Sequence, residues 1–241
     1  MPDARLGAAI FGSSGGIGAA LSRQLVQSGR FARVYAGSRE GQTDLSGTQP
    51  FAFDLTDEAS IAAAAAAFDP APDLVIVATG LLQDLTRQIT PEKSFRDIDP
   101  AAMAAVFAAN TIGPALIAKH CLPRLPRGAP AIFAVLSAKV GSIEDNQLGG
   151  WHSYRASKAA LNMLIKNIAI ELARSHPQAI AVALHPGTVD SRLSAPFQRG
   201  VPPGKLFSPD QAAGHLLDVI DNLAPADSGN LFAWDGTRLP F

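Results

Sequence analysis

The stretch Gly12-Ser13-Ser14-Gly15-Gly16-Ile17-Gly18 follows a short apolar run and opens an expected helix. Glycine at positions 12, 16 and 18 lets the backbone turn sharply and approach a ligand closely, because glycine has no Cβ. The free N–H groups at a helix N-terminus bind phosphate, and the helix dipole adds a partial positive charge there. The spacing G-x-x-x-G-x-G after a strand therefore predicts a pyrophosphate site for a dinucleotide, formed by Gly12, Ser14, Gly16, Ile17 and Gly18.

The rest of the chain alternates short apolar runs with longer helical stretches. We expect strands at residues 7–11, 33–36, 50–53, 74–78, 131–136, 180–184 and 230–233, and helices at residues 16–28, 57–68, 100–122, 153–175 and 209–222. The expected strands are continuously apolar, which is typical of a parallel sheet covered on both faces. This alternation predicts an α/β fold with a doubly wound parallel sheet, a Rossmann fold of about seven strands. No repeat or linker divides the sequence, so we expect residues 1–241 to form a single domain.

Composition excludes several classes of protein. The 241 residues are 47% hydrophobic and 17% charged, with 20 Lys and Arg against 21 Asp and Glu, which fits neither a disordered chain nor a nucleic-acid-binding protein. The single cysteine, Cys121, excludes a disulfide framework, and the five histidines lack the spacing of metal ligands. No apolar run reaches the roughly 20 residues of a membrane span, and no signal peptide is apparent. We therefore expect a cytoplasmic protein without a membrane or nucleic-acid partner.

The end of the second expected strand bears on the choice of dinucleotide. An acidic residue there usually binds the ribose 2′-hydroxyl of NAD, whereas an arginine accommodates the 2′-phosphate of NADP. The chain reads Ser38-Arg39-Glu40. An uncharged serine followed by a guanidinium, which pairs with phosphate through two parallel hydrogen bonds, favours NADP. If Glu40 faces the ribose instead of Arg39, NAD is the alternative.

Tyr154 and Lys158 form a second candidate site at the start of the expected helix 153–175. They are four residues apart, so they lie on one helical face with their side chains in reach of each other. A phenol with its ordinary pKa near 10 is a poor acid–base catalyst at neutral pH. A neighbouring ammonium and an oxidised nicotinamide favour the phenolate and lower that pKa. The pair therefore predicts a tyrosine that acts as general acid and base.

The glycine loop and the Tyr154–Lys158 pair, in this order, resemble the short-chain dehydrogenase/reductase family across essentially the whole chain. The same resemblance is carried by Asp54-Leu55, Asn110, Pro186-Gly187 and Trp234-Asp235-Gly236. Within that family the sequence is similar to the branch of C-factor-like proteins and sniffer-type carbonyl reductases.

The resemblance implies an oxidoreductase that transfers hydride between a nicotinamide cofactor and a carbonyl or alcohol substrate. It implies that Tyr154 protonates the carbonyl oxygen, that Lys158 binds the nicotinamide ribose, and that Asn110 holds a water linking Lys158 to solvent. The further cofactor contacts that we expect are Asp54 at the adenine, Leu55, Gly80, Pro186, Gly187 and Ser191.

Two segments depart from the family pattern. Residues 77–80 read Val-Ala-Thr-Gly where the family commonly has Asn-Asn-Ala-Gly. After the fifth strand the family often has two serines, the second of which orients the substrate, whereas this chain reads Ser137-Ala138. The hydroxyl then comes from Ser137 through an irregular backbone, comes from Ser142, or is absent. We expect Ser137 to supply it, with Ser142 as the alternative.

Two longer stretches point to further properties. Residues 187–208 are rich in Gly and Pro without a clear period, and a long loop of this kind is expected to act as a lid over the substrate. The expected helices 100–122 and 153–175 carry more apolar surface than one sheet face covers, which predicts a homo-oligomer, a dimer or tetramer.

Ala138 and the C-factor-like resemblance leave a second hypothesis open, a non-catalytic NAD(P)-binding regulatory or signalling protein.

Overall fold

The computed structural model describes residues 7–241. At its centre is an eight-stranded sheet in the order β10-β9-β6-β5-β4-β1-β2-β3, in which every pair is parallel except β9–β10. The strands of this sheet are β1 (Ala8–Phe11), β2 (Val34–Ser38), β3 (Gln49–Ala52), β4 (Leu74–Val77), β5 (Ala131–Leu136), β6 (Ala179–His185), β9 (Leu231–Ala233) and β10 (Arg238–Leu239). The predicted doubly wound α/β fold is thereby confirmed.

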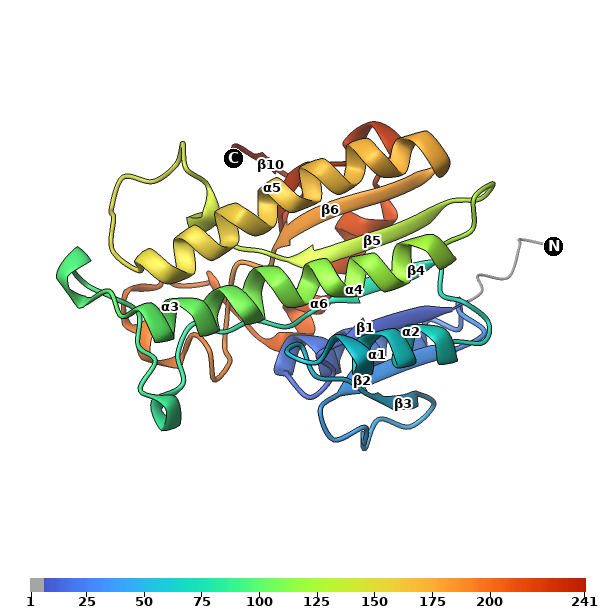
Figure 1. Cartoon of the computed structure of the whole chain (residues 1–241), viewed down its shortest axis with the longest axis horizontal. Coiled ribbons are helices and arrows are strands. Elements are labelled where there is room, and N and C mark those ends of the chain that lie inside the picture. The colour runs from blue at the N-terminus through green and yellow to red at the C-terminus, as the bar shows by residue number, and fades with distance from the viewer. Residues whose placement is uncertain (1–6) are drawn as a thin grey trace.

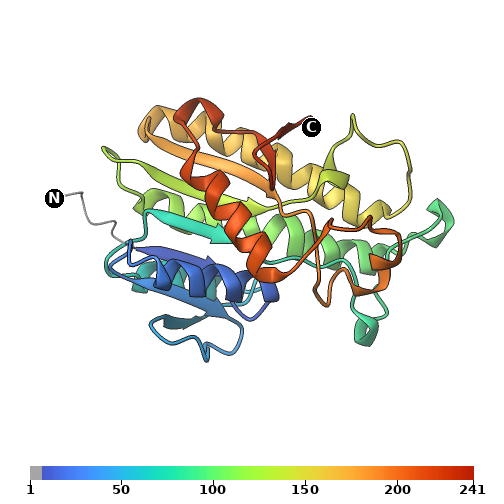
Figure 2. The ribbon, with the colours of Figure 1, turned by 180° about the vertical axis from the view of Figure 1, so that it is seen from behind.

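Helices cover both faces of the sheet. They are α1 (Gly16–Gln27), α2 (Glu58–Ala67), α3 (Pro100–Phe107), α4 (Gly113–Cys121), α5 (His152–Ser175) and α6 (Pro209–Asp221). Helices α2, α4 and α5 lie in front of the sheet in Figure 1, and α1 and α6 cover the opposite face in Figure 2. Successive strand residues point to opposite faces, so Phe11 belongs to the first core and Ile10 to the second. Two buried faces explain why the strands are continuously apolar.

Short elements connect these layers. They are the single turns of 3₁₀-helix Leu85–Arg87, Phe95–Asp97, Leu122–Arg124, Lys139–Gly141 and Pro225–Asp227, the longer 3₁₀-helix Ala195–Gly200, and a small parallel sheet of β7 (Thr188–Val189) and β8 (Leu206–Phe207). The expected lid, residues 187–208, thus contains two short strands and a helix.

The expected helix 100–122 is interrupted. Between α3 and α4 the chain forms a π-helix, Ala108–Ile112, whose wider turn inserts one extra residue, a feature that is frequent at functional sites. This π-turn carries the fully buried Asn110. By length and composition the stretch Pro100–Arg124 passes as one helix able to span a membrane, but here it lies in the helical layer, and α3 contacts α5. It therefore forms part of the helical layer that packs on the sheet and on α5.

The order of the strands reverses direction beside β1. The chain moves outward through β2 and β3 on one side of β1, and through β4, β5 and β6 on the other. In a doubly wound sheet, ligands bind at the carboxyl ends of the strands where this direction reverses. The loop after β1 and the residues after β4 flank that point, so the two candidate sites of the sequence meet at the same edge.

Candidate active site

The glycine loop joins β1 to α1 and is open to solvent at Ser14, Gly15 and Gly16. Its turn brings the backbone of Gly18 against that of Gly12, so that a Cβ on Gly18 would lie 2.2 Å from the Gly12 carbonyl oxygen. Only glycine fits there. The side chain of Ile17 is half-buried and packs toward β7, β8 and α6. The loop therefore presents backbone and small side chains, and no bulky group, to a ligand at the N-terminus of α1.

The residues after β2 and β3 form a neighbouring surface. Arg39 is exposed, while the buried Ser38 hydroxyl donates to the Gln42 carbonyl oxygen at 3.1 Å. The Asp54 carboxylate accepts hydrogen bonds from the N–H and the hydroxyl of Thr56, which hold its pKa below the ordinary range, and the nearby charge of Arg39 adds to that shift. Arg39 and Asp54 are thus near enough for their charges to interact. Leu55 packs instead against α4, where a Cβ on Gly113 would lie 2.6 Å from Leu55 Cδ2.

Tyr154 and Lys158 lie side by side in the first two turns of α5. Lys158 Nζ lies 5.9 Å from the centre of the Tyr154 ring and donates to the Leu136 carbonyl oxygen at 2.8 Å, at the end of β5. Burial raises the pKa of Tyr154 to about 12 and lowers that of Lys158 to about 7. The shift of Tyr154 is opposite to the lowering that its neighbours are expected to give. Loss of water around the phenolate is its cause, since burial disfavours a charged form.

Asn110 and Gly80 complete this cluster. The Asn110 side-chain oxygen accepts from the Leu81 N–H at 2.7 Å, and its amide donates to the Leu81 carbonyl oxygen and to Ser157 Oγ. A Cβ on Gly80 would lie 3.7 Å from Asn110 Oδ1 and 3.9 Å from Lys158 Nζ. The chain after β4, the π-turn and α5 therefore converge on Gly80. The side-chain amide of Asn110, on the π-turn, hydrogen-bonds directly to the other two segments, at Leu81 after β4 and at Ser157 on α5.

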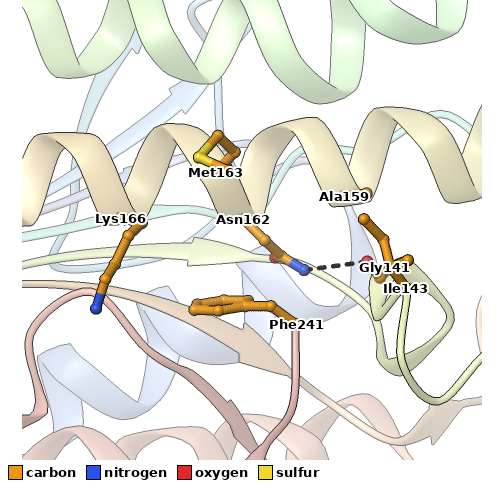
Figure 3. A pocket seen from close by; sticks show the side chains of 7 residues that line it. All are labelled: Gly141, Ile143, Ala159, Asn162, Met163, Lys166 and Phe241. Atoms are coloured by element: carbon orange, nitrogen blue, oxygen red, sulfur yellow. Dashed lines mark hydrogen bonds between the residues drawn. The ribbon is translucent and has the colours of Figure 1, made fainter.

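The two candidate serines are held by other residues. Ser137 Oγ donates to Asn162 Oδ1 at 2.7 Å, and the amide of Asn162 donates in turn to the Gly141 carbonyl oxygen (Figure 3). Ser142 Oγ accepts from the Asp145 N–H at 3.1 Å. Residue 138 has an extended backbone, and neighbouring side chains of extended chain point in opposite directions. Ala138 consequently packs beside Tyr154, while the hydroxyl of Ser137, which we expected there, is bound to Asn162.

An apolar wall surrounds Tyr154. It is formed by Leu82, Ala138, Val140, Trp151, Leu193 and Phe197. The ring of Trp151 is 4.7 Å from that of Phe197 and 6.2 Å from that of Tyr154, centre to centre. Leu193 and Phe197 belong to the expected lid, so this segment supplies one side of the wall. The phenol therefore stands in surroundings that are apolar on several sides.

The chain after β6 borders the same edge. Pro186 and Gly187 lead into β7, and a Cβ on Gly187 would lie 2.7 Å from Phe207 Cε2 and 3.1 Å from Trp234 Cδ1. A residue with a side chain is excluded there by two aromatic rings. Ser191 follows β7 with its hydroxyl 3.5 Å from that of Ser194. The backbone of this segment is thus fixed close to the carboxyl ends of the strands.

Comparison with known proteins agrees with this geometry. The family model for short chain dehydrogenases matches residues 7–201, which include the glycine loop, Tyr154 and Lys158. The chain belongs to the short-chain dehydrogenase family. The expectation drawn from these motifs is confirmed at that level.

Individual short-chain dehydrogenases and their relatives give a finer comparison. The chain is 38% identical over 146 residues to the C-signal of Myxococcus xanthus, a match that covers 60% of this chain and 82% of the relative. The NADPH-bound carbonyl reductase from chicken fatty liver is 26% identical, with a TM-score of 0.83 and coverage of 98% and 100% of the two chains. The carbonyl reductase Sniffer of Drosophila melanogaster has the same TM-score at 20% identity and coverage of 98% and 100%, and so shares the fold.

Several residues of this short-chain dehydrogenase site were missed by reasoning from the sequence. Thr79 lies against the glycine loop, its Cγ2 3.0 Å from where a Cβ on Gly12 would be, and its buried Oγ1 has no hydrogen-bond partner within residues 7–241. Leu82 forms part of the wall around Tyr154, and Asn162 holds Ser137. The unusual Val-Ala-Thr-Gly sequence was a signal for Thr79. Leu82 and Asn162 carry no local signal, because each acts through a contact with a distant segment.

Proposed function

We propose that the chain is an NADP(H)-dependent oxidoreductase that interconverts carbonyl compounds and alcohols, with Tyr154 as the proton donor and acceptor. The observation that carries the proposal is the convergence of Tyr154, Lys158 and Gly80 beside the glycine loop. Burying a phenol and an amine together disfavours folding, and groups with strongly shifted pKa values cluster at functional sites. Membership in the short-chain dehydrogenase family supports the same chemistry.

The residues at this edge fit a nicotinamide dinucleotide. The tight turn at Gly12 and Gly18 leaves the N-terminus of α1 open, and the unpartnered Thr79 hydroxyl beside it offers a hydrogen bond to a polar ligand. We assign the pyrophosphate to this loop, together with Ser14, Gly16 and Ile17. When bound, the cofactor supplies or accepts the hydride. The further contacts that we propose are Ser38, Arg39, Asp54, Leu55, Gly80, Pro186, Gly187 and Ser191.

Tyr154 and Lys158 would handle the proton. The Tyr154 hydroxyl donates its proton to the carbonyl oxygen during reduction and takes it back during oxidation. A pKa of about 12 keeps the phenol protonated at neutral pH, as a donor requires, whereas a pKa of about 7 lets Lys158 gain or lose its own proton there. In its charged form Lys158 stabilises the tyrosinate that remains. Asn110 holds α5 to the chain after β4, and we retain the proposal that it binds the relay water.

The substrate that we propose is an apolar carbonyl compound. The wall around Tyr154 consists of apolar and aromatic side chains, with Ala138 in place of a hydroxyl. The Ser137 hydroxyl already donates to Asn162, and Ser142 Oγ already accepts from the Asp145 N–H. The substrate oxygen would therefore be positioned by Tyr154 and by packing of its apolar part, without a serine. A substrate with polar groups on several sides would lose hydrogen bonds to water in such a pocket.

NADP is the form of the cofactor that we propose. Arg39 is exposed at the end of β2 and close enough to Asp54 for its charge to lower the carboxyl pKa. A guanidinium in this position pairs with a 2′-phosphate. The similarity to a carbonyl reductase that binds NADPH supports this choice over NAD.

We also propose a cytoplasmic homo-oligomer. Ile112, Met163 and Ile170 are more than half exposed, at 53%, 62% and 51%, although they stand on the π-turn and on α5. Apolar side chains of this size on helices are typical of surfaces that another subunit covers. A dimer or tetramer formed through this helical layer would bury them.

NADPH consumption across a panel of aryl and alkyl ketones and aldehydes tests the function. We expect turnover of apolar compounds, and we expect Tyr154→Phe to lower it by about 1,000-fold, because a positioned general acid contributes about 10²–10⁴. Binding of NADPH to this variant, measured by fluorescence titration, should stay within about threefold, which separates chemistry from binding.

One pattern would favour the rival hypothesis of a regulatory or signalling protein, for which the similarity to the C-signal is the specific observation. In that pattern NADPH binds, no carbonyl compound or alcohol is turned over, and Tyr154→Phe changes nothing.

A further inference from the structure

Glu92 is a buried carboxylate that the proposed chemistry does not use. It lies in the loop between β4 and α3, and its side chain is 6% exposed. Both of its oxygens accept from the Ser153 N–H, at 3.2 and 3.3 Å, and Oε1 also accepts from the Ser153 hydroxyl. Within residues 7–241 no salt bridge to a Lys, Arg or His accompanies it. Burying a carboxylate is unfavourable for folding unless hydrogen-bond donors replace its water. Ser153 and the start of α5 supply these donors to Glu92.

The helix that Glu92 reaches has no cap of its own. Trp151 stands at the N-cap of α5 and provides no side-chain hydrogen bond. The first N–H groups of a helix have no partner within the helix, and an acceptor or a negative charge near them stabilises it. Glu92 supplies that acceptor from 61 residues away, at Ser153, the residue directly before Tyr154.

The turn that enters α5 is held by the same residue. Residues 149–151 have left-handed backbones, with φ of 63° at Gly149, 67° at Gly150 and 50° at Trp151. A left-handed conformation is unfavourable for tryptophan, which has a Cβ. The Trp151 N–H donates to the backbone carbonyl oxygen of Glu92 at 2.6 Å. Glu92 thus binds the turn through its backbone and the helix through its side chain.

We propose that Glu92 is a positioning residue for the reaction, a role that rests on the proposed function. By fixing Trp151 and Ser153, it sets the direction in which Tyr154 enters the pocket and the place of the Trp151 ring in the apolar wall. Left-handed non-glycine residues persist where surrounding structure enforces them, and they cluster at functional sites. Without the Glu92 carboxylate the first turn of α5 loses its acceptor, while the hydrogen bond from the Trp151 N–H to the backbone carbonyl oxygen of residue 92 remains. Because Tyr154 directly follows Ser153, its side chain would then shift in the pocket.

Two substitutions at Glu92 test this role. Glu92→Ala removes the acceptor, and we expect kcat to fall by about tenfold to 100-fold, since a displacement of about 1 Å at a reacting group has effects of this size. The KM for NADPH should stay within about threefold, because the hydrogen bonds of Glu92 reach α5 and its entry turn and not the glycine loop. Glu92→Gln keeps an oxygen that can accept from Ser153, so it should recover most of kcat. Glu58→Ala is the matched control, because Glu58 is a partly exposed carboxylate that pairs with Lys119 on another helix.

A spectroscopic readout makes the test independent of turnover. The chain has two tyrosines, so Tyr35→Phe leaves Tyr154 as the only phenol. Glu92→Ala is introduced into this Tyr35→Phe parent. We expect absorbance titration to show Tyr154 ionising at lower pH in the double variant than in the parent, since water reaches a phenol that is no longer held. If the parent turns over no carbonyl compound, the proposed function fails, while the titration still decides whether Glu92 holds Tyr154. An unchanged titration and unchanged kcat, with only a lower Tm, would overturn the proposal and leave Glu92 as a helix cap.

Discussion

The two ends of the candidate site, the glycine loop and the surroundings of Tyr154, are built in different ways. At the glycine loop, the decisive contact joins Gly12 and Gly18, which are six residues apart, and the loop is exposed. Around Tyr154, the contacts join segments that are distant in sequence. Asn110 binds Leu81, and Ser153 binds Glu92. The first end needs small residues and a helix start, whereas the second depends on most of the sheet being assembled.

The two ends also differ in electrostatics. The glycine loop is exposed at Ser14, Gly15 and Gly16, and Arg39, directly after the neighbouring strand β2, is exposed as well. Tyr154 and Lys158 are buried, and burial alone shifts their pKa values in opposite directions. Charges at the glycine-loop end are therefore screened by solvent and salt. Charges at the Tyr154 end lose their hydration when the protein folds, which lowers its stability. Changes at the Tyr154 end should affect chemistry and stability together.

After Tyr154→Phe, Lys158→Met should show the largest effect on turnover. We expect turnover to fall by at least about 100-fold, in the range that acid–base groups contribute. The apoprotein should nevertheless become more stable at neutral pH, because an uncharged side chain removes the desolvation of the ammonium. Folding lowers the Lys158 pKa from 10.5 to about 7, so between these values the unfolded chain holds a proton that the folded chain lacks. The stability of the wild-type apoprotein therefore increases as the pH rises from about 7 to 10.5.

The Lys158→Met variant lacks this titrating group. The difference in stability by which it exceeds wild type should therefore shrink as the pH rises from about 7 toward about 10. Thermal unfolding of both apoproteins at about pH 7 and about pH 10 measures the difference. An advantage that stayed constant or grew with pH would mean that Lys158 is not desolvated as the structure places it.

Gly18→Ala tests the other end. The new Cβ would lie 2.2 Å from the Gly12 carbonyl oxygen, so the loop has to open. We expect NADPH affinity to fall by roughly tenfold to 100-fold, which corresponds to the about 1–3 kcal/mol that overpacking costs. Gly128→Ala is the matched control, because nothing lies within 4 Å of a Cβ there. Isothermal titration with NADPH gives both values, and equal affinities would show that the loop does not bind the cofactor.

Much of the glycine-loop end could be predicted from the sequence, because local spacing determines it. A strand, a G-x-x-x-G-x-G turn and a helix suffice to place Gly12 and Gly18, and the alternation of apolar runs predicted the sheet. The π-turn at Asn110 was not predicted, since α3 and α4 read as one apolar helix. The direction of Ser137 was not predicted either. It depends on Asn162 across the sheet–helix interface, and no local pattern in the sequence reports such a contact.

Arg39→Asp should have a more selective effect at the glycine-loop end. Replacing the guanidinium by a carboxylate removes the partner of a 2′-phosphate and offers an acceptor to a 2′-hydroxyl. We expect the ratio of kcat/KM for NADPH over NADH to fall by about tenfold or more, the worth of a charge-assisted hydrogen bond. Steady-state kinetics with both cofactors measures it. Glu40→Gln is the control, and a ratio that moved with Glu40 and not with Arg39 would reassign the residue that faces the ribose.

Ser137→Ala should have the smallest effect on turnover, and it separates packing from chemistry at the Tyr154 end. The Ser137 hydroxyl is bound to Asn162, so its loss should leave kcat within about threefold. It also leaves the buried Asn162 oxygen without that donor, which costs about 1–3 kcal/mol, or roughly 2–12 °C in Tm for a chain of this size. If turnover instead fell by about 100-fold while Tm stayed unchanged, the hydroxyl would have to act at the substrate. The structure would then have to rearrange around residues 137–142 when substrate binds, because Ala138 now fills the position beside Tyr154.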